Sequence, residues 1–166
     1  MTIPFGNLTS KAHVAAWLAN HAVYRWHNNP DMAHVSESVA DHVSDMLTLH
    51  LRVFGGYPEA DLYAAIVFHD AHEATLGDMP SPAKVRFPAL AAAYDEAAAE
   101  IDAANGWTVN LSDDDRAKLQ LLDKLSAYRC VADNAPDLLA RAEWLDTRER
   151  IIAMAEVCNA DLGGII

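Results

Sequence analysis

A cluster of ionisable side chains follows an apolar run in the stretch FHDAHEATLGDMPSP, residues 68–82. At about 100° per residue, Ile66, His69 and Glu73 fall within about 60° of one another on a helix, and Asp70 lies beside them. A buried carboxylate without a partner is costly, so either this end of the helix is exposed or a nearby charge compensates it. Imidazole and carboxylate groups at this spacing suit metal ligation and acid–base chemistry.

Two other segments place a polar residue within an apolar helical stripe. His42 follows the helical spacing of Val39 and Met46, and Asp123 follows the spacing of Leu119. Three predicted helices therefore each bring an imidazole or a carboxylate to a core-facing position. The resulting candidate metal ligands are His42, His69, Asp70 and Asp123. A set of two histidines and two carboxylates suits Mn, Fe, Co, Ni or Zn, and the cation would neutralise the buried carboxylates.

Each of these residues also has a simpler interpretation when it is taken alone. A single helical histidine is usually a surface or hydrogen-bonded residue. Asp123 can form an ion pair with Lys124 or Arg116 instead of binding a metal. His72 lies further round the predicted helix from His69, so we expect it at most to contact a metal-binding residue and not to bind the metal itself. The combination of the three segments, and no single residue, favours the metal site.

The composition favours a single helical domain over residues 1–166. Of the 166 residues, 52% are hydrophobic, alanine is abundant, and runs of β-branched residues are scarce. We expect a core over about residues 9–159 and a loose tail over residues 160–166. Thr9 or Ser10 is expected to cap the first helix, Ser36 the second and Ser112 the fifth. The predicted helices span residues 11–23, 37–54, 58–76, 89–105, 113–134 and 138–160.

The charge and the absence of several motifs exclude some classes of function. Twelve Lys and Arg residues stand against 24 Asp and Glu, which gives a net charge of −12 and disfavours nucleic-acid polymers and anionic membranes as partners. The sequence contains no run of about 20 apolar residues, no secretory signal and no disulfide framework, so we expect a cytoplasmic protein. It also lacks a P-loop. The absence of a G-x-S-x-G elbow and of a plausible cysteine nucleophile pairing disfavours covalent catalysis.

Five short motifs together resemble the HD-domain metal-dependent phosphohydrolases. They are RW at 25–26, SVADH at 38–42, HDAHE at 69–73, GDMPSPAK at 77–84 and DKLSAY at 123–128. Within that family the sequence is most similar to the group of 5′-deoxynucleotidases and phage dATP triphosphohydrolases. The resemblance covers about residues 9–159, and the pairing of HD-x-x-E with G-D-x-P-[ST]-P-x-K is its most specific part.

The resemblance implies a fold and a set of residue roles. The fold is an all-α bundle with a metal site between helices. The implied ligands of a divalent ion (Co, Mn, Zn, Fe, Ni or Mg) are His42, His69, Asp70 and Asp123. Glu73, together with Asp70, is the implied catalytic carboxylate. The implied substrate-binding residues are Arg25 and Lys84 at phosphate oxygens, Trp26 at the sugar or base, and Asp78 at the sugar.

Three departures from the family pattern leave the form of the substrate open. Val43 stands where serine is common, no further arginine lies between Trp26 and His42, and the interval from His42 to His69 is short. The leading prediction is a 5′-(deoxy)nucleotidase that removes phosphate from nucleoside 5′-monophosphates. The alternatives are a dNTP triphosphohydrolase, a non-catalytic metal- or nucleotide-binding module, and a structural helical interaction protein. A small-molecule nucleotide is the expected partner, and a homo-oligomer, a dimer or larger, stays open.

Overall fold

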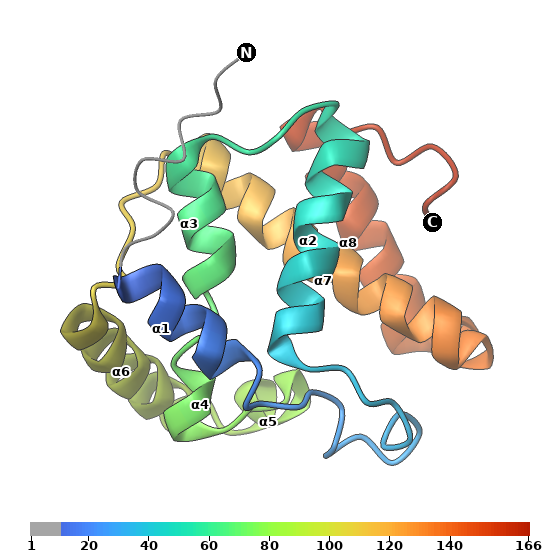
Figure 1. Ribbon diagram of the computed structural model, residues 1–166. Helices are drawn as coiled ribbons and strands as arrows, with labels where there is room; N and C mark the ends of the chain where they lie inside the picture. Colours follow the sequence, from blue (N-terminus) through green and yellow to red (C-terminus); the bar gives the residue numbers. More distant parts are fainter. Residues whose placement is uncertain (1–10) are drawn as a thin grey trace.

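The computed structural model describes residues 11–166, and this part of the chain is built from helices (Figure 1). Its only extended pairing is an isolated antiparallel bridge between Tyr24 and Ser38. The all-α prediction is therefore confirmed. The helices are α1 (Lys11–Asn20), α2 (Val39–Phe54), α3 (Ala60–Phe68), α4 (Glu73–Leu76), α5 (Ser81–Arg86), α6 (Pro88–Asn105), α7 (Asp113–Asn134), the 3₁₀ helix η1 (Pro136–Ala140) and α8 (Ala142–Cys158).

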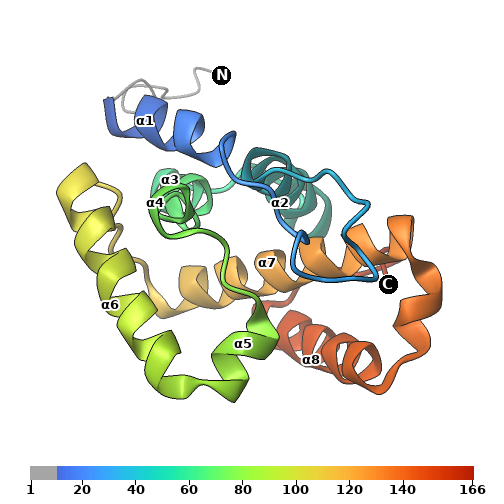
Figure 2. The ribbon, with the colours of Figure 1, turned by 90° about the horizontal axis from the view of Figure 1, so that it is seen from below.

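Helix α7 forms the centre of the bundle. It packs against α8 on one side and against α2 and α3 on the other (Figures 1 and 2). Its side chains Leu121, Leu122 and Leu125 are fully buried, as are Val43 and Met46 of α2. Helix α1 covers α3 and α4, while α6 contacts α4 and α5 at the edge of the bundle (Figure 2). The three segments with candidate ligands therefore meet at the core.

The start of α2 is fixed by a capping box. The Ser38 Oγ accepts a hydrogen bond from the Asp41 backbone N–H at 3.1 Å, and the Asp41 carboxylate accepts one from the Ser38 N–H at 2.9 Å. The prediction of Ser36 as the cap was wrong, because Glu37 and Ser38 pair with residues 24–25 before the helix begins. The predicted cap Ser112 of α7 is confirmed.

The predicted helix over residues 58–76 is interrupted. Helix α3 ends at Phe68, and α4 begins at Glu73. Between them the chain tightens into turns in which the N–H of Ala71 donates to Phe68 O at 3.0 Å, and that of Glu73 to Asp70 O at 3.0 Å. These bonds span three residues instead of four. The tighter winding changes the directions of the side chains at 69–72, where the chemistry is concentrated.

The C-terminal residues also differ from expectation. The N–H of Asp161 donates to Val53 O at 3.0 Å, and Leu162, Ile165 and Ile166 pack against the core, so the segment 160–166 is not a loose tail. The helix expected from residue 138 begins at Ala142, after the 3₁₀ helix at Pro136. The expected caps Thr9 and Ser10 lie outside the described residues. Within residues 11–166, no helix has the length and apolar character needed to cross a membrane.

Candidate metal centre

Two imidazoles approach each other at the junction of α2, α3 and α7. The Nε2 atoms of His42 and His69 lie 3.3 Å apart. His42 projects from the first turn of α2 and is fully buried, while His69 directly follows α3 and is largely buried. Their rings are tilted by 54°, with centroids 5.3 Å apart. The predicted meeting of positions 42 and 69 is therefore present in the structure.

Hydrogen bonds at the far side of each ring leave both Nε2 atoms directed at the shared point. The Nδ1–H of His69 donates to the Ile66 carbonyl at 2.8 Å, because a carbonyl can only accept. His42 Nδ1 pairs with Ser126 Oγ at 3.0 Å. In a neutral ring with the proton on Nδ1, Nε2 carries the free lone pair. This is the arrangement in which histidines ligate a metal through Nε2 while an outer partner fixes the ring.

Two carboxylates complete the cluster. An Asp123 oxygen lies 3.3 Å from His42 Nε2. An Asp70 oxygen lies 3.2 Å from His69 Nε2 and 4.0 Å from His42 Nε2. Lys124, the alternative partner of Asp123, reaches its other oxygen only at 3.9 Å, and both side chains there are more than a third exposed. The structure thus brings together all four residues that the sequence analysis selected as ligands.

The charges in the cluster favour occupation by a cation. Burial, followed by the charge of Arg25, lowers the pKa of His42, which keeps this ring neutral and able to ligate. Burial alone would lower the pKa of His69. The nearby Asp70 carboxylate has the larger effect and raises the pKa of His69 to about 9. Although burial favours the neutral acid, the His69 charge holds the pKa of Asp70 well below its usual range. A proton on His69 thus supplies the positive charge that a metal ion would supply.

The donor set fits a divalent ion. One ligand atom from each of His42, His69 and Asp123 can be chosen so that all lie within 4.8 Å of one another. Asp70 adds a second carboxylate at the same place. Two imidazoles and two carboxylates match the preferences of Mn, Fe, Co, Ni and Zn. This part of the chain could therefore hold a metal, and the chemistry of the donors does not distinguish among those ions.

Glu73 lies at the start of α4, one turn beyond His69, and is buried. Its Oε2 has no hydrogen-bond partner among the described residues. Burial, followed by the charges of Asp70 and Asp78, raises the pKa of Glu73 to about 8. A carboxyl group of this kind holds a proton at neutral pH and can transfer it, so the position suits an acid–base role.

Arg25 and Trp26 lie in the loop before α2 and share one partner that the sequence analysis missed. Arg25 Nη1 donates to Glu37 Oε2 at 3.3 Å, and Trp26 Nε1 donates to the same oxygen at 2.6 Å. The charge of Arg25 opposes the rise that burial causes in the pKa of Asp78, and it adds to the lowering of the pKa of Asp70, after the larger contributions of His69 and His42. The guanidinium therefore lies within electrostatic range of the metal cluster.

Asp78 and Lys84 lie on the other side of the cluster, in the loop after α4 and in α5. Burial raises the pKa of Asp78, while the charges of Arg25 and Lys84 oppose that rise. Lys84 Nζ lies 5.3 Å from the centre of the Tyr94 ring, and the Tyr94 hydroxyl donates to Gly77 O at 2.7 Å. Tyr94 of α6 was not predicted, because no local pattern reports a contact between α6 and this loop.

His72 pairs with a residue of α6 and with none of the four clustered residues. Its Nδ1 lies 3.3 Å from an Asp102 oxygen, so it connects the start of α4 to α6.

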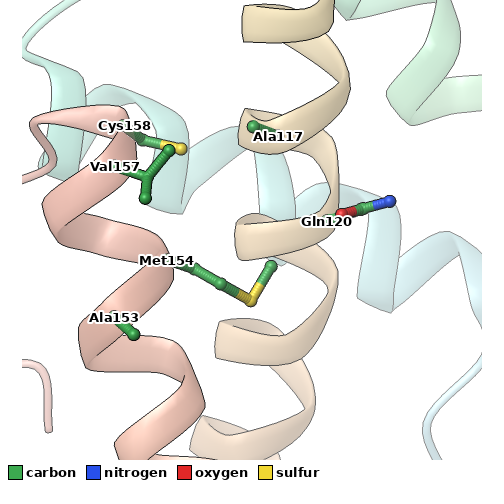
Figure 3. Close-up of a pocket in the computed structure, with 6 residues that line it drawn as sticks. All are labelled: Ala117, Gln120, Ala153, Met154, Val157 and Cys158. Atoms are coloured by element: carbon green, nitrogen blue, oxygen red, sulfur yellow. The ribbon is translucent and has the colours of Figure 1, made fainter.

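A separate apolar pocket lies between α7 and α8 and includes none of the clustered residues (Figure 3). Met154 reaches from α8 toward α7 there, and burial raises the pKa of the nearby Cys158 thiol (Figure 3). This pocket offers hydrophobic surface and no cluster of ionised donors.

A comparison with known protein families agrees with this geometry. A family model described as 5′-deoxynucleotidase YfbR-like matches residues 14–147, a span that includes the four clustered residues and the loops beside them. A search of curated proteins and a search of solved structures found no match. The match covers most of the 166 residues and agrees with the all-α fold. The chain therefore belongs to the YfbR-like 5′-deoxynucleotidase family, a group of HD-domain phosphohydrolases.

Proposed function

We propose that this protein is a metal-dependent 5′-nucleotidase that removes phosphate from (deoxy)nucleoside 5′-monophosphates. The observation that carries the proposal is the 3.3 Å approach of the Nε2 atoms of His42 and His69 beside two carboxylates. Two carboxylates gathered this closely around a fully buried imidazole are typically balanced by a cation. The family of the chain supports the same class of reaction.

In this proposal the ligands of the divalent ion are His42, His69, Asp70 and Asp123. The ion, when bound, supplies water activation and Lewis-acid polarisation of a phosphoryl oxygen. The protein prepares the ligands in advance, because the bonds from Ile66 O and Ser126 Oγ fix both rings before a metal arrives.

Glu73 is the proposed acid–base residue. Burial and the neighbouring carboxylates raise its pKa to about 8 in the metal-free protein, so Glu73 can hold a proton, and as the acid it would pass that proton to the 5′-oxygen of the sugar. The oxygen of water bonds to phosphorus as the bond between phosphorus and the 5′-oxygen breaks. One hydrogen of the water stays on the new phosphate hydroxyl and the other returns to Glu73, so the products are a nucleoside and orthophosphate, and atoms and charges balance.

The residues around the centre would bind the substrate. Arg25 and Lys84 would contact phosphate oxygens and offset their charge as the bond breaks. Trp26 would pack against the sugar or base, and Asp78 would accept a hydrogen bond from a sugar hydroxyl. The burial of Asp78 and the influence of both Arg25 and Lys84 on its pKa support this placement.

The local charge balance supports a monophosphate over a triphosphate. The cations near the centre include Arg25, Lys84 and Lys124, of which Arg25 already pairs with Glu37 and Lys124 faces Asp123. A triphosphate carries more negative charge and would meet the carboxylates of Asp70 and Asp78 with little surplus positive charge to offset it. The smaller anion is the better match.

A substrate screen tests the proposal. The purified protein is incubated with Mn²⁺, Co²⁺, Ni²⁺, Zn²⁺ or Mg²⁺ and with each nucleoside mono- and triphosphate. Orthophosphate released from dAMP or another monophosphate is the expected result. Tripolyphosphate released from dATP would identify a triphosphohydrolase, and binding without turnover would identify a non-catalytic module. Asp70→Ala is the inactive control, and Asp137→Ala, an exposed aspartate in η1, is the matched control.

A further inference from the structure

Glu37 connects the two substrate-binding residues of the loop before α2. One of its oxygens accepts from Arg25 Nη1 at 3.3 Å and from Trp26 Nε1 at 2.6 Å. The side chains of Arg25 and Glu37 are only 14% and 12% exposed, so this ion pair is shielded from solvent and stronger than a surface pair. The shared oxygen therefore fixes the guanidinium and the indole relative to each other.

The backbone holds Glu37 equally firmly. The N–H of Arg25 donates to Glu37 O at 2.8 Å, and the N–H of Val39 donates to Val23 O at 3.0 Å, around the bridge between Tyr24 and Ser38. Ser38 is the cap of α2, the helix that carries His42. Glu37 is thus attached directly to the helix that contributes a ligand, and through it Arg25 is aligned with the metal centre.

Trp26 adopts a backbone conformation that needs support. Its φ is +68°, in the left-handed region that a bulky side chain rarely adopts. Such a conformation persists only when surrounding contacts determine it, and it is typical of functional sites. The indole N–H bonded to Glu37, together with the ring contact to Trp144 at 6.4 Å, provides that support.

Arg25 keeps hydrogen-bonding capacity for a ligand. A guanidinium has five N–H donors, and in the part of the chain that the structure describes Glu37 is the only side-chain acceptor bonded to it. Its charge acts on His42, Asp70, Glu73 and Asp78. The donors not bonded to Glu37 are therefore available to an anion beside the metal centre.

We propose that Glu37 is a positioning residue that holds Arg25 and Trp26 as a preformed clamp for the phosphate and sugar of the substrate. Glu37 itself contacts no substrate and acts through these two side chains. This inference rests on the proposed function for the identity of the ligand. It adds a residue that neither the sequence motifs nor the metal cluster would select.

Phosphate binding tests the clamp without relying on turnover. Protein loaded with Mn²⁺ is titrated with inorganic phosphate in a calorimeter. Glu37→Ala is expected to weaken binding about tenfold, because an immobilised charged hydrogen-bond partner of the phosphate is lost. Glu37→Gln keeps the size and one acceptor, so about a threefold loss is expected. Glu149→Ala, an exposed glutamate of α8, should bind phosphate as the unmodified protein does.

A double-mutant cycle separates positioning from a general structural role. In an Arg25→Ala background, replacing Glu37 should change phosphate affinity by less than about twofold, because the residue through which it acts is gone. The proposal would be overturned if replacing Glu37 in the Arg25→Ala background weakened phosphate binding as much as it does in the otherwise unmodified protein. It would also be overturned if Glu37→Ala or Glu37→Gln bound phosphate as tightly as the unmodified protein, or more tightly. Absence of phosphate binding by the unmodified protein would do the same.

Turnover and folding are measured in parallel. Thermal unfolding of each variant checks that it is folded, and Glu37→Gln provides a conservative variant if Glu37→Ala does not fold. Release of orthophosphate from dAMP by the unmodified protein reports on the proposed function alone. A protein that binds phosphate through the clamp but does not cleave dAMP would contradict the proposed function and leave the clamp supported.

Discussion

Two regions of the molecule meet at the proposed metal centre and are built in different ways. The first, which we call the ligand wall, consists of His42, His69, Asp70 and Asp123 on or beside α2, α3 and α7. The second, which we call the substrate rim, consists of Arg25, Trp26, Asp78 and Lys84, three of them in loops and one in the short helix α5. The wall is anchored in the buried core, whereas the rim is held by a few side-chain contacts.

Because the two regions are held in different ways, we expect the ligand wall to control metal binding and the substrate rim to control substrate binding. The imidazoles of the wall are fixed through Nδ1 by Ser126 and Ile66, both part of packed helices. Arg25 of the rim is fixed chiefly by Glu37, and Lys84 by its contact with the Tyr94 ring. Changes in the wall should therefore remove the metal, and changes in the rim should leave the metal bound and weaken the substrate.

The largest expected effect is at the wall. Asp70→Ala removes a carboxylate 3.2 Å from His69 Nε2, so we expect loss of bound metal and at least about a 1,000-fold loss of kcat/KM. Metal analysis after dialysis and a nucleotidase assay measure both. Near-normal activity with normal metal content would separate Asp70 from the centre.

The rim gives the contrasting result. Arg25→Ala should lower kcat/KM about 100-fold, mainly through a higher KM, while metal content stays the same. Steady-state kinetics with dAMP and metal analysis of the same sample report this. Arg148→Ala on the exposed face of α8 serves as the matched control. If Arg25→Ala also released the metal, the distinction between wall and rim would be lost.

Glu73 provides a test through pH, because its burial has a thermodynamic consequence. Its pKa is about 8 in the folded protein and near its ordinary 4.5 when unfolded, so between these values the unfolded state releases the proton first. The free energy of unfolding of the metal-free protein should therefore fall as pH rises from about 4.5 to 8. Glu73→Gln cannot titrate and should lack this part of the fall.

The measured quantity is the difference in free energy of unfolding between Glu73→Gln and the unmodified protein at each pH. In the presence of a chelator, the increase in the free energy of unfolding of Glu73→Gln over the unmodified protein should be larger at pH 8 than at pH 5 by about 3 to 4 kcal/mol. Denaturant unfolding at each pH gives the values, and Glu149→Gln is the control. Parallel stability curves for the two proteins would show that Glu73 is not buried as an uncharged acid.

A smaller effect is expected at Ser126, which contacts a residue of the ligand wall but is not itself a proposed ligand. Ser126→Ala removes the partner of His42 Nδ1 at 3.0 Å and should weaken metal affinity about tenfold, because the ring is less firmly oriented. Competition with a chelating dye measures this. Ser44→Ala, an exposed serine of α2, should not change it. Equal affinities for both variants would mean that packing alone orients the His42 ring.

The smallest effect separates the two candidate caps of α2. Ser38→Ala should lower the free energy of unfolding by about 1 kcal/mol, because it removes the oxygen that accepts from the Asp41 N–H. Ser36→Ala should change it by less than about half as much. Thermal or denaturant unfolding compares them. A larger loss for Ser36→Ala would contradict the capping box in the structure.

The ligand wall could be predicted from the sequence, and the contacts of the rim could not. The wall follows helical periodicity, since His42 and Asp123 each occupy a position in an apolar stripe. The interruption at residues 69–72 contains no glycine or proline to signal it. The positive φ of Trp26 has no signal either, and the contact from Glu37 depends on a tertiary hydrogen bond across 11 residues. Long-range side-chain contacts of this kind leave no periodic pattern in the sequence.

The most direct test of the central claim is to locate the metal. Crystals grown with Mn²⁺ or Co²⁺ are measured at the absorption edge of the metal, and the anomalous difference map marks the ion. We predict one peak within bonding distance of the Nε2 atoms of His42 and His69 and of oxygens of Asp70 and Asp123. A peak elsewhere, or imidazoles turned away from a common ion, would contradict the proposed centre.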